Sequence, residues 1–390
     1  MFSLKKSAFI PTLLSLSSIF ILTPANAAAN DYQYLQGING KLVTYCGAES
    51  AACAVVIDEF NRKVAQVNGD NQFEAKFIRL STSEMMSRIK GELEKSARAS
   101  KRKCKSLADD ALENCKEKVY KSKVDLAFYG TDDPYKTALQ DDLFAVHKYP
   151  VDESVQPWAS SLTWDSGNRL GALYMGILGL GVNTELLQKL DIPKPMCWKD
   201  LENPAYKDQI VVANWNTSGT AYKFAATMLQ AFDGDQDKGW DSVIKVHQNV
   251  SQYTKSGSKG VKMAAAGETL IGIGFGHDIV DLMQKGFPIE MVAPCEGTLY
   301  EVGPVGIVRG APNRAAAEAF TTFLYEKETQ ELLATVGSLQ FPSSSAAAAP
   351  KGSEQLTDAK LILSDSRFAT KSYKNAIIQK WTNEIFPVSR

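Results

Sequence analysis

The sequence of 390 residues has no excess of charge of either sign and, beyond its first 27 residues, no long apolar run. Its 43 Lys and Arg residues are offset by 44 Asp and Glu residues, so the formal net charge is -1. Nucleic-acid-binding proteins carry a basic face, and a membrane-spanning helix needs about 18 or more consecutive apolar residues. We therefore expect a soluble chain after residue 27 and no nucleic-acid partner.

Several catalytic and nucleotide-binding motifs are also missing. The chain has no Gly-x-Ser-x-Gly elbow, no HExxH motif and no kinase signature. The glycines at 179–181 and 272–276 lack both the full spacing of a dinucleotide-binding loop and a P-loop lysine. These absences favour a protein that binds a molecule without converting it, and we expect no cofactor and no resident metal. A secreted phosphatase-like hydrolase is the alternative from another class, with Ser258, His277 and Asp278 as its polar residues.

The first residues have the features of a secretory signal peptide. Lys5 and Lys6 precede an apolar stretch at 8–22, and Ala25-Asn26-Ala27 matches a small-residue cleavage site. We predict a signal peptide at 1–27. Its removal takes away two lysines and no acid, which changes the formal charge from -1 to -3.

The six cysteines of an exported chain favour disulfide bonds, because the compartment is oxidising and the count is even. A zinc site is the alternative, but no CxxC pair or histidine cluster accompanies them. Proximity in the sequence favours two pairs and leaves a third. The predicted pairs are Cys46–Cys53, Cys104–Cys115 and Cys197–Cys295.

Strand-like and helix-like segments alternate along the chain, which is the pattern of an α/β protein. We expect a first strand at 41–45 and a second at 73–80. Ser81-Thr82-Ser83-Glu84 has the spacing of a capping box, so a helix is expected to begin there.

Residues 94–123 hold ten Lys or Arg residues and five Asp or Glu residues. We interpret this segment as an inserted helical hairpin, closed by Cys104–Cys115. Its positive face could contact a transporter or an anionic surface, and a solvated hairpin without a role is the alternative.

Five segments of the second half carry the most information. They are Asn-Trp-Asn-Thr-Ser-Gly-Thr-Ala-Tyr at 214–222, Ser-Gly-Ser at 256–258, Gly-Glu at 267–268, Gly-Phe-Gly-His-Asp at 274–278 and Pro-Cys-Glu-Gly-Thr-Leu-Tyr-Glu at 294–301. In order and spacing they resemble the second lobe of periplasmic solute-binding proteins of ABC importers. The resemblance is to the ferric-type group, which also includes binders of hexose phosphates, aminoethylphosphonate and thiamine.

This resemblance implies a two-lobed periplasmic binding protein of type 2, with a hinge and a ligand cleft between the lobes. Lobe 1 would comprise 28–148 and 304–390, and lobe 2 would comprise 149–303, with hinge strands near 146–152 and 301–307. The tail ending in Trp381 and Ile385 would pack on lobe 1. A monomer in the periplasm would deliver a small anionic solute to an ABC permease and its ATPase.

Helix N-termini supply unpaired N–H groups for an anion. Two candidates precede expected helices, Ser81-Thr82-Ser83 and Ser218-Gly219-Thr220, although hydroxyl residues are also ordinary helix caps. Ser256 and Ser258 form a third small-residue turn. We expect the anionic group of a ligand at 81–83 and 218–220.

His277 and Asp278 follow a glycine-rich strand, at the end where open α/β sheets place ligands. In hexose-phosphate binders of the group, a His-Asp pair and a later Glu contact the sugar. Here the later residue would be Glu301, with Glu296 as its rival. The alternative is that Asp278 merely caps a helix.

Tyr45 and Thr131 complete the candidate ligand-binding residues. Ferric iron is a rival cargo, but ferric binders of the group typically use adjacent tyrosines, and the sequence has no Tyr-Tyr pair. Thiamine or its phosphate is a third option. A hexose phosphate is favoured and a phosphonate comes next.

Overall fold

The computed structural model describes residues 32–69, 72–353 and 359–388, so the predicted signal peptide at 1–27 lies outside the described residues. Within these ranges, ten strands form one sheet in the order β2-β1-β3-β9-β4-β7-β5-β6, and β8 and β10 also pair with β4. The strands are Lys41–Cys46 (β1), Glu74–Arg79 (β2), Leu126–Phe128 (β3), Gly171–Asn183 (β4), Ile210–Ala213 (β5), Val250–Thr254 (β6), Ile271–Phe275 (β7), Ile289–Val292 (β8), Tyr300–Ile307 (β9) and Phe341–Pro342 (β10).

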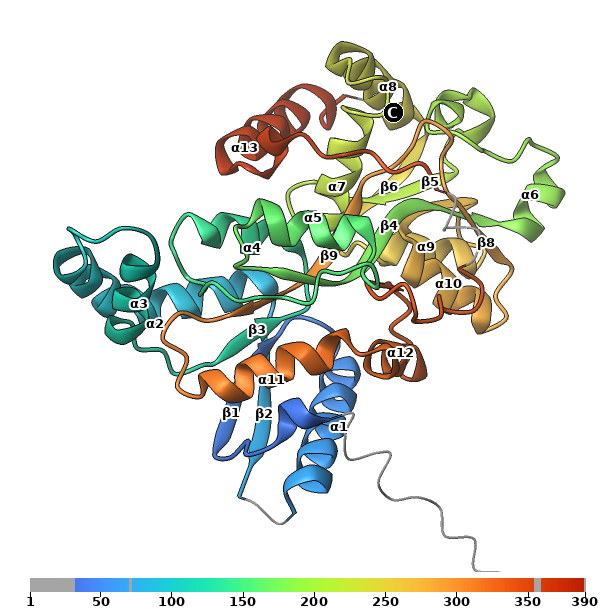
Figure 1. Ribbon diagram of the computed structural model, residues 1–390. Coiled ribbons are helices and arrows are strands. Elements are labelled where there is room, and N and C mark those ends of the chain that lie inside the picture. The colour runs from blue at the N-terminus through green and yellow to red at the C-terminus, as the bar shows by residue number, and fades with distance from the viewer. Residues whose placement is uncertain (1–31, 70–71, 354–358, 389–390) are drawn as a thin grey trace, which may run out of the picture.

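Helices alternate with these strands and cover the faces of the sheet (Figure 1), as the α/β pattern of the sequence predicts. They are Ser50–Asn68 (α1), Thr82–Lys103 (α2), Asp109–Val119 (α3), Asp132–Leu139 (α4), Pro157–Asp165 (α5), Thr184–Leu190 (α6), Gly219–Met228 (α7), Gln236–Asn249 (α8), Lys259–Ala265 (α9), Gly276–Gln284 (α10), Arg314–Tyr325 (α11), Lys327–Thr335 (α12) and Lys371–Lys380 (α13). Short 3-10 helices lie at Gln33–Leu35, Lys199–Glu202, Pro204–Tyr206 and Ser366–Ala369, and a π-helical turn at Trp381–Ile385.

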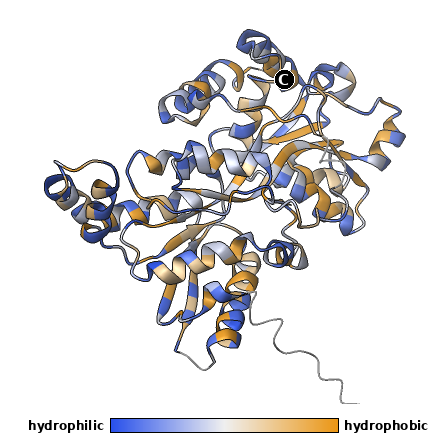
Figure 2. Ribbon diagram, in the orientation of Figure 1, coloured by the Kyte–Doolittle hydropathy of each residue, from blue (hydrophilic) through white to orange (hydrophobic). Residues whose placement is uncertain are grey.

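Separate hydrophobic cores mark the two lobes. The first core is built around β1, β3, α1 and α11, with Phe60, Phe128 and Phe320 packed ring against ring. The second is built around β5, β7 and α7, with Trp198 and Phe224 in contact. A smaller core lies under α9 and α10. The apolar residues of the strands, visible in Figure 2, supply these cores.

Two long strands connect the lobes. All 13 residues of β4 are buried, which fits a strand covered on both faces. Its first part, from Gly171 to Ile177, pairs with β9, and its second part pairs with β7 and β8. β9 continues from β4 to β3 in the first lobe.

The crossing from lobe 1 to lobe 2 differs from our expectation. Tyr149, Leu162 and Tyr174 still belong to the first core, whereas Leu178 belongs to the second. The chain therefore changes core within β4 and not at 149, because α5 and the first half of β4 pack on lobe 1. The chain returns to the first lobe along β9.

The C-terminal tail also corrects our expectation. Trp381 and Ile385 are buried in the second core, where the Trp381 ring stacks on Trp215 with centroids 5.1 Å apart. Tyr222 of α7 donates a hydrogen bond to the Phe368 carbonyl at 2.6 Å. The tail therefore packs on lobe 2, beside α7 and α8 (Figure 1). Its apolar periodicity shows that it packs, but not on which lobe.

The segment at 94–123 forms a helical hairpin from the second half of α2 and from α3, as predicted, and it extends from the body of lobe 1 (Figure 1). Its inner side is anchored by Arg309, which is fully buried. The Arg309 guanidinium lies 2.7 Å from both Glu113 and Asp142, and 3.2 Å from Glu117. The exposed side is rich in basic residues.

All three predicted disulfide bonds are present: Cys46–Cys53, Cys104–Cys115 and Cys197–Cys295. A search of the described helices found none with the length and apolar character that crossing a membrane requires.

Candidate functional site

One cavity of about 360 Å³ collects the amino ends of four helices. It is lined by Gly47 and Ala48 ahead of α1, by Ser81 and Thr82 at the start of α2, by Gly130 and Thr131 ahead of α4, and by His277 and Asp278 at the start of α10. Its volume lies within the range of small-molecule sites. Two larger hollows of about 600 Å³ flank the hairpin, but neither gathers several helix amino ends.

The helix ends at the cavity offer backbone N–H groups. Within the described chain, α1, α4 and α10 have no side-chain cap: the side chains of their N-cap residues accept no hydrogen bond from the N–H groups of the first turn. The first N–H groups of a helix have no partner inside it, and the helix dipole adds partial positive charge there. Three uncapped helix ends around one cavity favour an anionic group.

The amino ends of α2 and α4 are held together by direct contacts. Ser81 Oγ accepts the Glu84 N–H at 3.4 Å, so the predicted cap is present, and Thr82 Oγ1 accepts the Thr131 N–H at 3.1 Å. Gly130 has φ of +89°, and a side chain there would collide with Thr82 Oγ1. Gly130 is therefore required for this approach.

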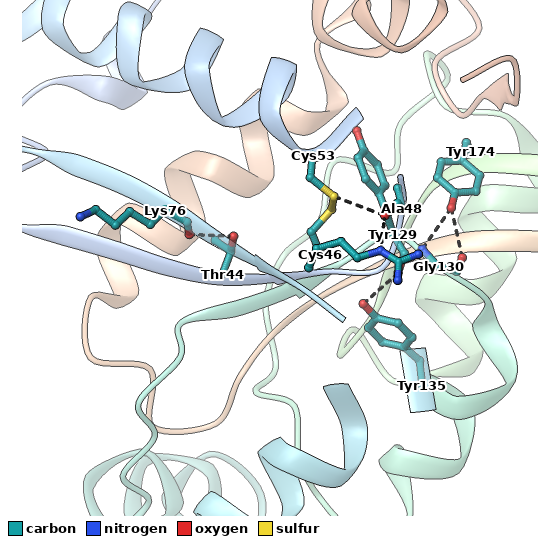
Figure 3. The surroundings of a disulfide bond; sticks show 10 residues. Thr44, Cys46, Ala48, Cys53, Lys76, Tyr129, Gly130, Tyr135 and Tyr174 are labelled. Atoms are coloured by element: carbon teal, nitrogen blue, oxygen red, sulfur yellow. Dashed lines mark hydrogen bonds between the residues drawn. A yellow bond between two sulfur atoms is a disulfide. The ribbon is translucent and has the colours of Figure 1, made fainter. Parts of the chain in front are cut away.

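Tyr174 of β4 fixes the same turn. Its hydroxyl accepts the Gly130 N–H at 3.0 Å and donates to the Gly130 carbonyl at 3.2 Å (Figure 3). Both roles of the hydroxyl are thus satisfied, and the turn ahead of α4 is linked to the crossing strand β4.

His277 and Glu301 line the opposite part of the cavity and flank Gly176 of β4. A Cβ atom at Gly176 would lie 3.0 Å from His277 Nδ1 and 3.1 Å from Glu301 Cγ. The glycine therefore lets both side chains approach the backbone of β4. The His277 ring stacks on Phe275 with centroids 5.4 Å apart, which sets its orientation.

The His277 and Glu301 side chains both have pKa values shifted by burial, and His277 also has a ring nitrogen without a partner. His277 Nδ1 is buried and has no hydrogen-bond partner among the described residues. Burial lowers the pKa of His277, against the opposing charge of Asp278, so the imidazole is neutral near pH 7. Burial raises the pKa of Glu301 to about 8, although Lys223 opposes this. Neutral groups of this kind can exchange hydrogen bonds with ligand hydroxyls.

A buried ion cluster adjoins Glu301. Lys223 Nζ of α7 lies 4.0 Å from an oxygen of Asp132 and 4.0 Å from an oxygen of Asp133, both at the start of α4. Lys136 Nζ lies 2.5 Å from the other oxygen of Asp132. Burial raises the pKa of Asp132, but the charges of Lys223 and Lys136 outweigh burial and lower it. The cluster therefore joins α4 of lobe 1 to α7 of lobe 2.

Six of the predicted site residues line this cavity together, and they come from both halves of the sequence: Ser81, Thr82, Thr131, His277, Asp278 and Glu301. The other predicted residues do not line it: Tyr45, Ser83, Ser218, Gly219, Thr220, Ser256, Ser258 and Glu296.

Several residues of the second set have structural partners. The Tyr45 hydroxyl donates to Glu92 at 2.8 Å, and Ser218 Oγ caps α7 by accepting the Ala221 N–H at 3.3 Å. The Glu296 carboxylate accepts the N–H groups of Trp198 and Lys199 at 2.7 and 2.8 Å. This carboxylate therefore organises the loop beside Cys197–Cys295, which explains its place in the motif.

The turn at 218–220 packs on the third predicted turn. A Cβ atom at Gly257 would collide with Thr220 Oγ1, so Ser256 and Ser258 flank a glycine that lies against the start of α7. These two turns support each other at a distance from the lining of the cavity.

The sequence did not indicate four contributors to the site: Arg79, the turn at 47–52, Asp132 and Lys223. Arg79 and the turn at 47–52 line the cavity, and the ion pair of Asp132 and Lys223 borders Glu301. One signal was available, because Gly47 follows a strand and lies inside the loop closed by Cys46–Cys53. The pairing of Asp132 with Lys223 depends on the arrangement of the lobes and leaves no local trace in the sequence.

Comparisons with known proteins agree with this architecture. A family model described as bacterial extracellular solute-binding protein matches residues 122–370. An uncharacterized protein of Haemophilus influenzae is 33% identical over 350 residues, which cover 89% of this chain and 91% of that protein.

Two solved structures share the fold. One is the periplasmic binding protein AfuA from Actinobacillus pleuropneumoniae, with exogenous fructose-6-phosphate bound. It is 34% identical, and the match covers 90% of this chain and all of AfuA (100%), with a TM-score of 0.69. The other, iron-bound HitA from Pseudomonas aeruginosa, is 15% identical, with coverage of 87% and 98% and a TM-score of 0.66. At that identity, the likeness to HitA concerns the fold alone.

Proposed function

Because the chain belongs to the bacterial extracellular solute-binding proteins, as a periplasmic substrate-binding protein of the ferric-type group, we propose that it carries a small phosphorylated organic molecule. A hexose phosphate is the favoured cargo and a phosphonate the second. The protein is the solute-binding component of an ABC transporter, and proteins of its family bind solutes and are not enzymes.

The observation that carries this proposal is the division of the cavity into two parts of different chemistry. Uncapped helix ends surround one part, and they suit a phosphoryl group. His277, Asp278 and Glu301 line the other part, and they suit adjacent hydroxyl groups. A hexose phosphate has both kinds of group at opposite ends of one molecule.

The lobes supply different parts of this site. Thr82 and Thr131 belong to lobe 1, whereas His277 and Asp278 come from lobe 2. A ligand that contacts both sets binds the closed arrangement better than the open one, and so shifts the population toward closure. The closed carrier would then release its cargo, chemically unchanged, to the permease.

The similarity to AfuA supports a sugar phosphate, since that protein was solved with fructose-6-phosphate bound. Ferric iron would need hard oxygen ligands, such as tyrosine hydroxyls. The hydroxyl of Tyr174 is engaged with Gly130, and that of Tyr222 with the Phe368 carbonyl. These two hydroxyls are therefore committed to the fold, and Tyr300 remains as a tyrosine that an iron site could use.

The test is a binding screen with ligand-free protein. Glucose 6-phosphate, fructose 6-phosphate, 2-aminoethylphosphonate, Fe(III) and thiamine are compared by thermal shift and calorimetry, with unphosphorylated glucose and fructose as controls. A ligand at 100 times its dissociation constant should stabilise the protein by about 2.7 kcal/mol. Recovery of the intact sugar phosphate without free phosphate separates a carrier from a hydrolase.

Asp278→Ala should abolish the response, because it removes an acceptor of the hydroxyl-binding part. Asp241→Ala, at an exposed position of α8, is the matched control and should leave the response unchanged. Stabilisation by the unphosphorylated sugars alone, or by none of the phosphorylated compounds, would overturn the proposed cargo.

A further inference from the structure

We propose that the turn between Cys46 and Cys53, together with Arg79, forms the subsite for the phosphoryl group of the cargo, and that the Cys46–Cys53 disulfide positions it. This inference rests on the proposed function, but it concerns residues that the sequence did not indicate. The turn connects the end of β1 to the start of α1.

The turn lies directly on the cavity. Gly47, Ala48, Glu49 and Ala52 line it, and all four lie inside the loop that the disulfide closes. The Cys53 N–H donates to the Glu49 carbonyl at 3.1 Å, which is the first backbone hydrogen bond of α1. The N–H groups at 50–52 precede that bond and, with no side-chain cap on α1, remain available to an anion.

Arg79 brings a positive charge to the same turn. It stands at the end of β2, and its Nε donates to the Ala48 carbonyl at 3.1 Å, which leaves the outer nitrogens of the guanidinium unused in that bond. Among the described residues that line the cavity, Arg79 is the one permanent cation, whereas Glu49, Asp278, Asp281 and Glu301 are acidic. Arg79 and the N–H groups of the turn therefore offer the positive charge that an anionic group needs, and together they outnumber the one acid of the turn, Glu49.

A second observation indicates that a ligand belongs in this cavity. His277 and Glu301 line it from the other side: the buried His277 Nδ1 has no hydrogen-bond partner among the described residues, and the Glu301 side chain is only 7% exposed. A buried polar group without a partner costs free energy. A ligand that reaches from the turn to His277 and Glu301 would supply a partner for the His277 nitrogen.

The disulfide and the neighbouring turn hold the subsite in place. Cys46 and Cys53 are both fully buried (0% exposed), so the disulfide is part of the packed interior of lobe 1 and is shielded from solvent. Gly47 donates to the Phe128 carbonyl at 3.0 Å, and a Cβ atom there would lie 2.8 Å from the Tyr129 carbonyl. The cross-linked turn therefore lies in close contact with Tyr129 and Gly130, which precede α4 (Figure 3).

The cross-link holds the N–H groups of the turn in their binding positions before the ligand arrives. Without the bond, ordering the turn would cost conformational entropy on each binding event. Cys46 and Cys53 are therefore positioning residues, and their removal should weaken binding by more than a loss of overall stability explains.

The experiment compares two disulfides of one protein. Cys46→Ala/Cys53→Ala removes the bond at the subsite, and Cys104→Ala/Cys115→Ala removes the bond of the hairpin as the matched control. The Kd for fructose 6-phosphate is measured by calorimetry at a temperature where circular dichroism shows both variants folded. We expect about a tenfold or greater rise in Kd for the subsite variant and none for the control.

Arg79→Gln provides a test that does not depend on the disulfide. It should raise the Kd for fructose 6-phosphate by about tenfold or more, Arg79→Lys should restore part of the affinity, and Arg88→Gln on the exposed side of α2 should have no effect. Wild-type protein that binds no phosphorylated compound would refute the proposed function. Wild-type protein that binds tightly, with Arg79→Gln and the subsite variant equally tight, would refute the subsite alone.

Discussion

Replacing Glu301 with glutamine should change how the stability of the protein depends on pH. The side chain is only 7% exposed, and burial raises its pKa from 4.5 to about 8. In the unfolded chain the same carboxyl group ionises near its ordinary pKa of 4.5. Between these two values the folded state holds a proton that the unfolded state has lost.

The direction in which stability changes with pH follows from this difference in bound protons. Because the unfolded state binds fewer protons, the contribution of Glu301 to stability is complete below pH 4.5 and is lost as the pH rises toward about 8. The loss is at most about 1.4 kcal/mol per pH unit, and on the order of 5 kcal/mol over the whole interval. Glutamine has a similar shape and does not titrate.

The assay is urea unfolding of ligand-free wild type and Glu301→Gln at pH 5, 6, 7, 8, 9 and 10. The free energy of unfolding of the variant, minus that of the wild type, should increase by about 1.4 kcal/mol per pH unit and level off above pH 8. Glu301→Asp keeps a carboxyl group and is the control that should follow the wild type. A difference between Glu301→Gln and wild type that is independent of pH would refute the reasoning.

Two further variants test the ion clusters. Arg309→Met should destabilise the protein by roughly 2 to 3 kcal/mol and speed tryptic cleavage of the hairpin, because it removes the buried cation that pairs with Glu113 and Asp142 and leaves Lys116 as the one cation that contacts both in the described structure. Unchanged cleavage would show that Arg309 does not anchor the hairpin. Lys223→Met should shift the end of the pH-dependent interval above pH 8, because the charge of Lys223 lowers the pKa of Glu301. The unfolding free energy of Lys223→Met is compared with that of Lys223→Met/Glu301→Gln, which lacks the titrating carboxyl group. If the difference levels off at the same pH as in the wild-type background, Lys223 does not influence the pKa of Glu301.

The predicted site residues coincide with the lining of the cavity at some of the helix starts that the sequence marks. Thr82 and Asp278 lie at helix starts that the sequence marks with hydroxyl or acidic residues, and both line the cavity. Ser218 gives the same local signal, yet the structure uses it to cap α7. A capping residue and a ligand-binding residue look alike in a sequence, because both place an acceptor or a free N–H group at the first turn.

The tail and the lobe boundary show that the sequence also does not reveal which parts of the chain pack together. The spacing of apolar residues around Trp381 predicts a buried face, but Trp215 and Tyr222, which receive the tail, lie far away in the chain. Tyr149 lies where we expected a hinge, but its ring is buried in the first core. Periodicity records that a face is buried and does not record its partner.

The sequence by itself determined the alternation of strands and helices and the family, because short-range spacing and characteristic motifs carry that information. It favoured the three disulfide pairs by proximity, and the structure decided among the possible pairings. Only the tertiary structure decided that the turn at 47–52, Arg79 and Glu301 surround one cavity, and that Lys223 faces Asp132 across the lobes. These residues are brought together by the crossing strands β4 and β9. The electrostatics of the site depends on that convergence and on the burial it produces, neither of which any local segment encodes.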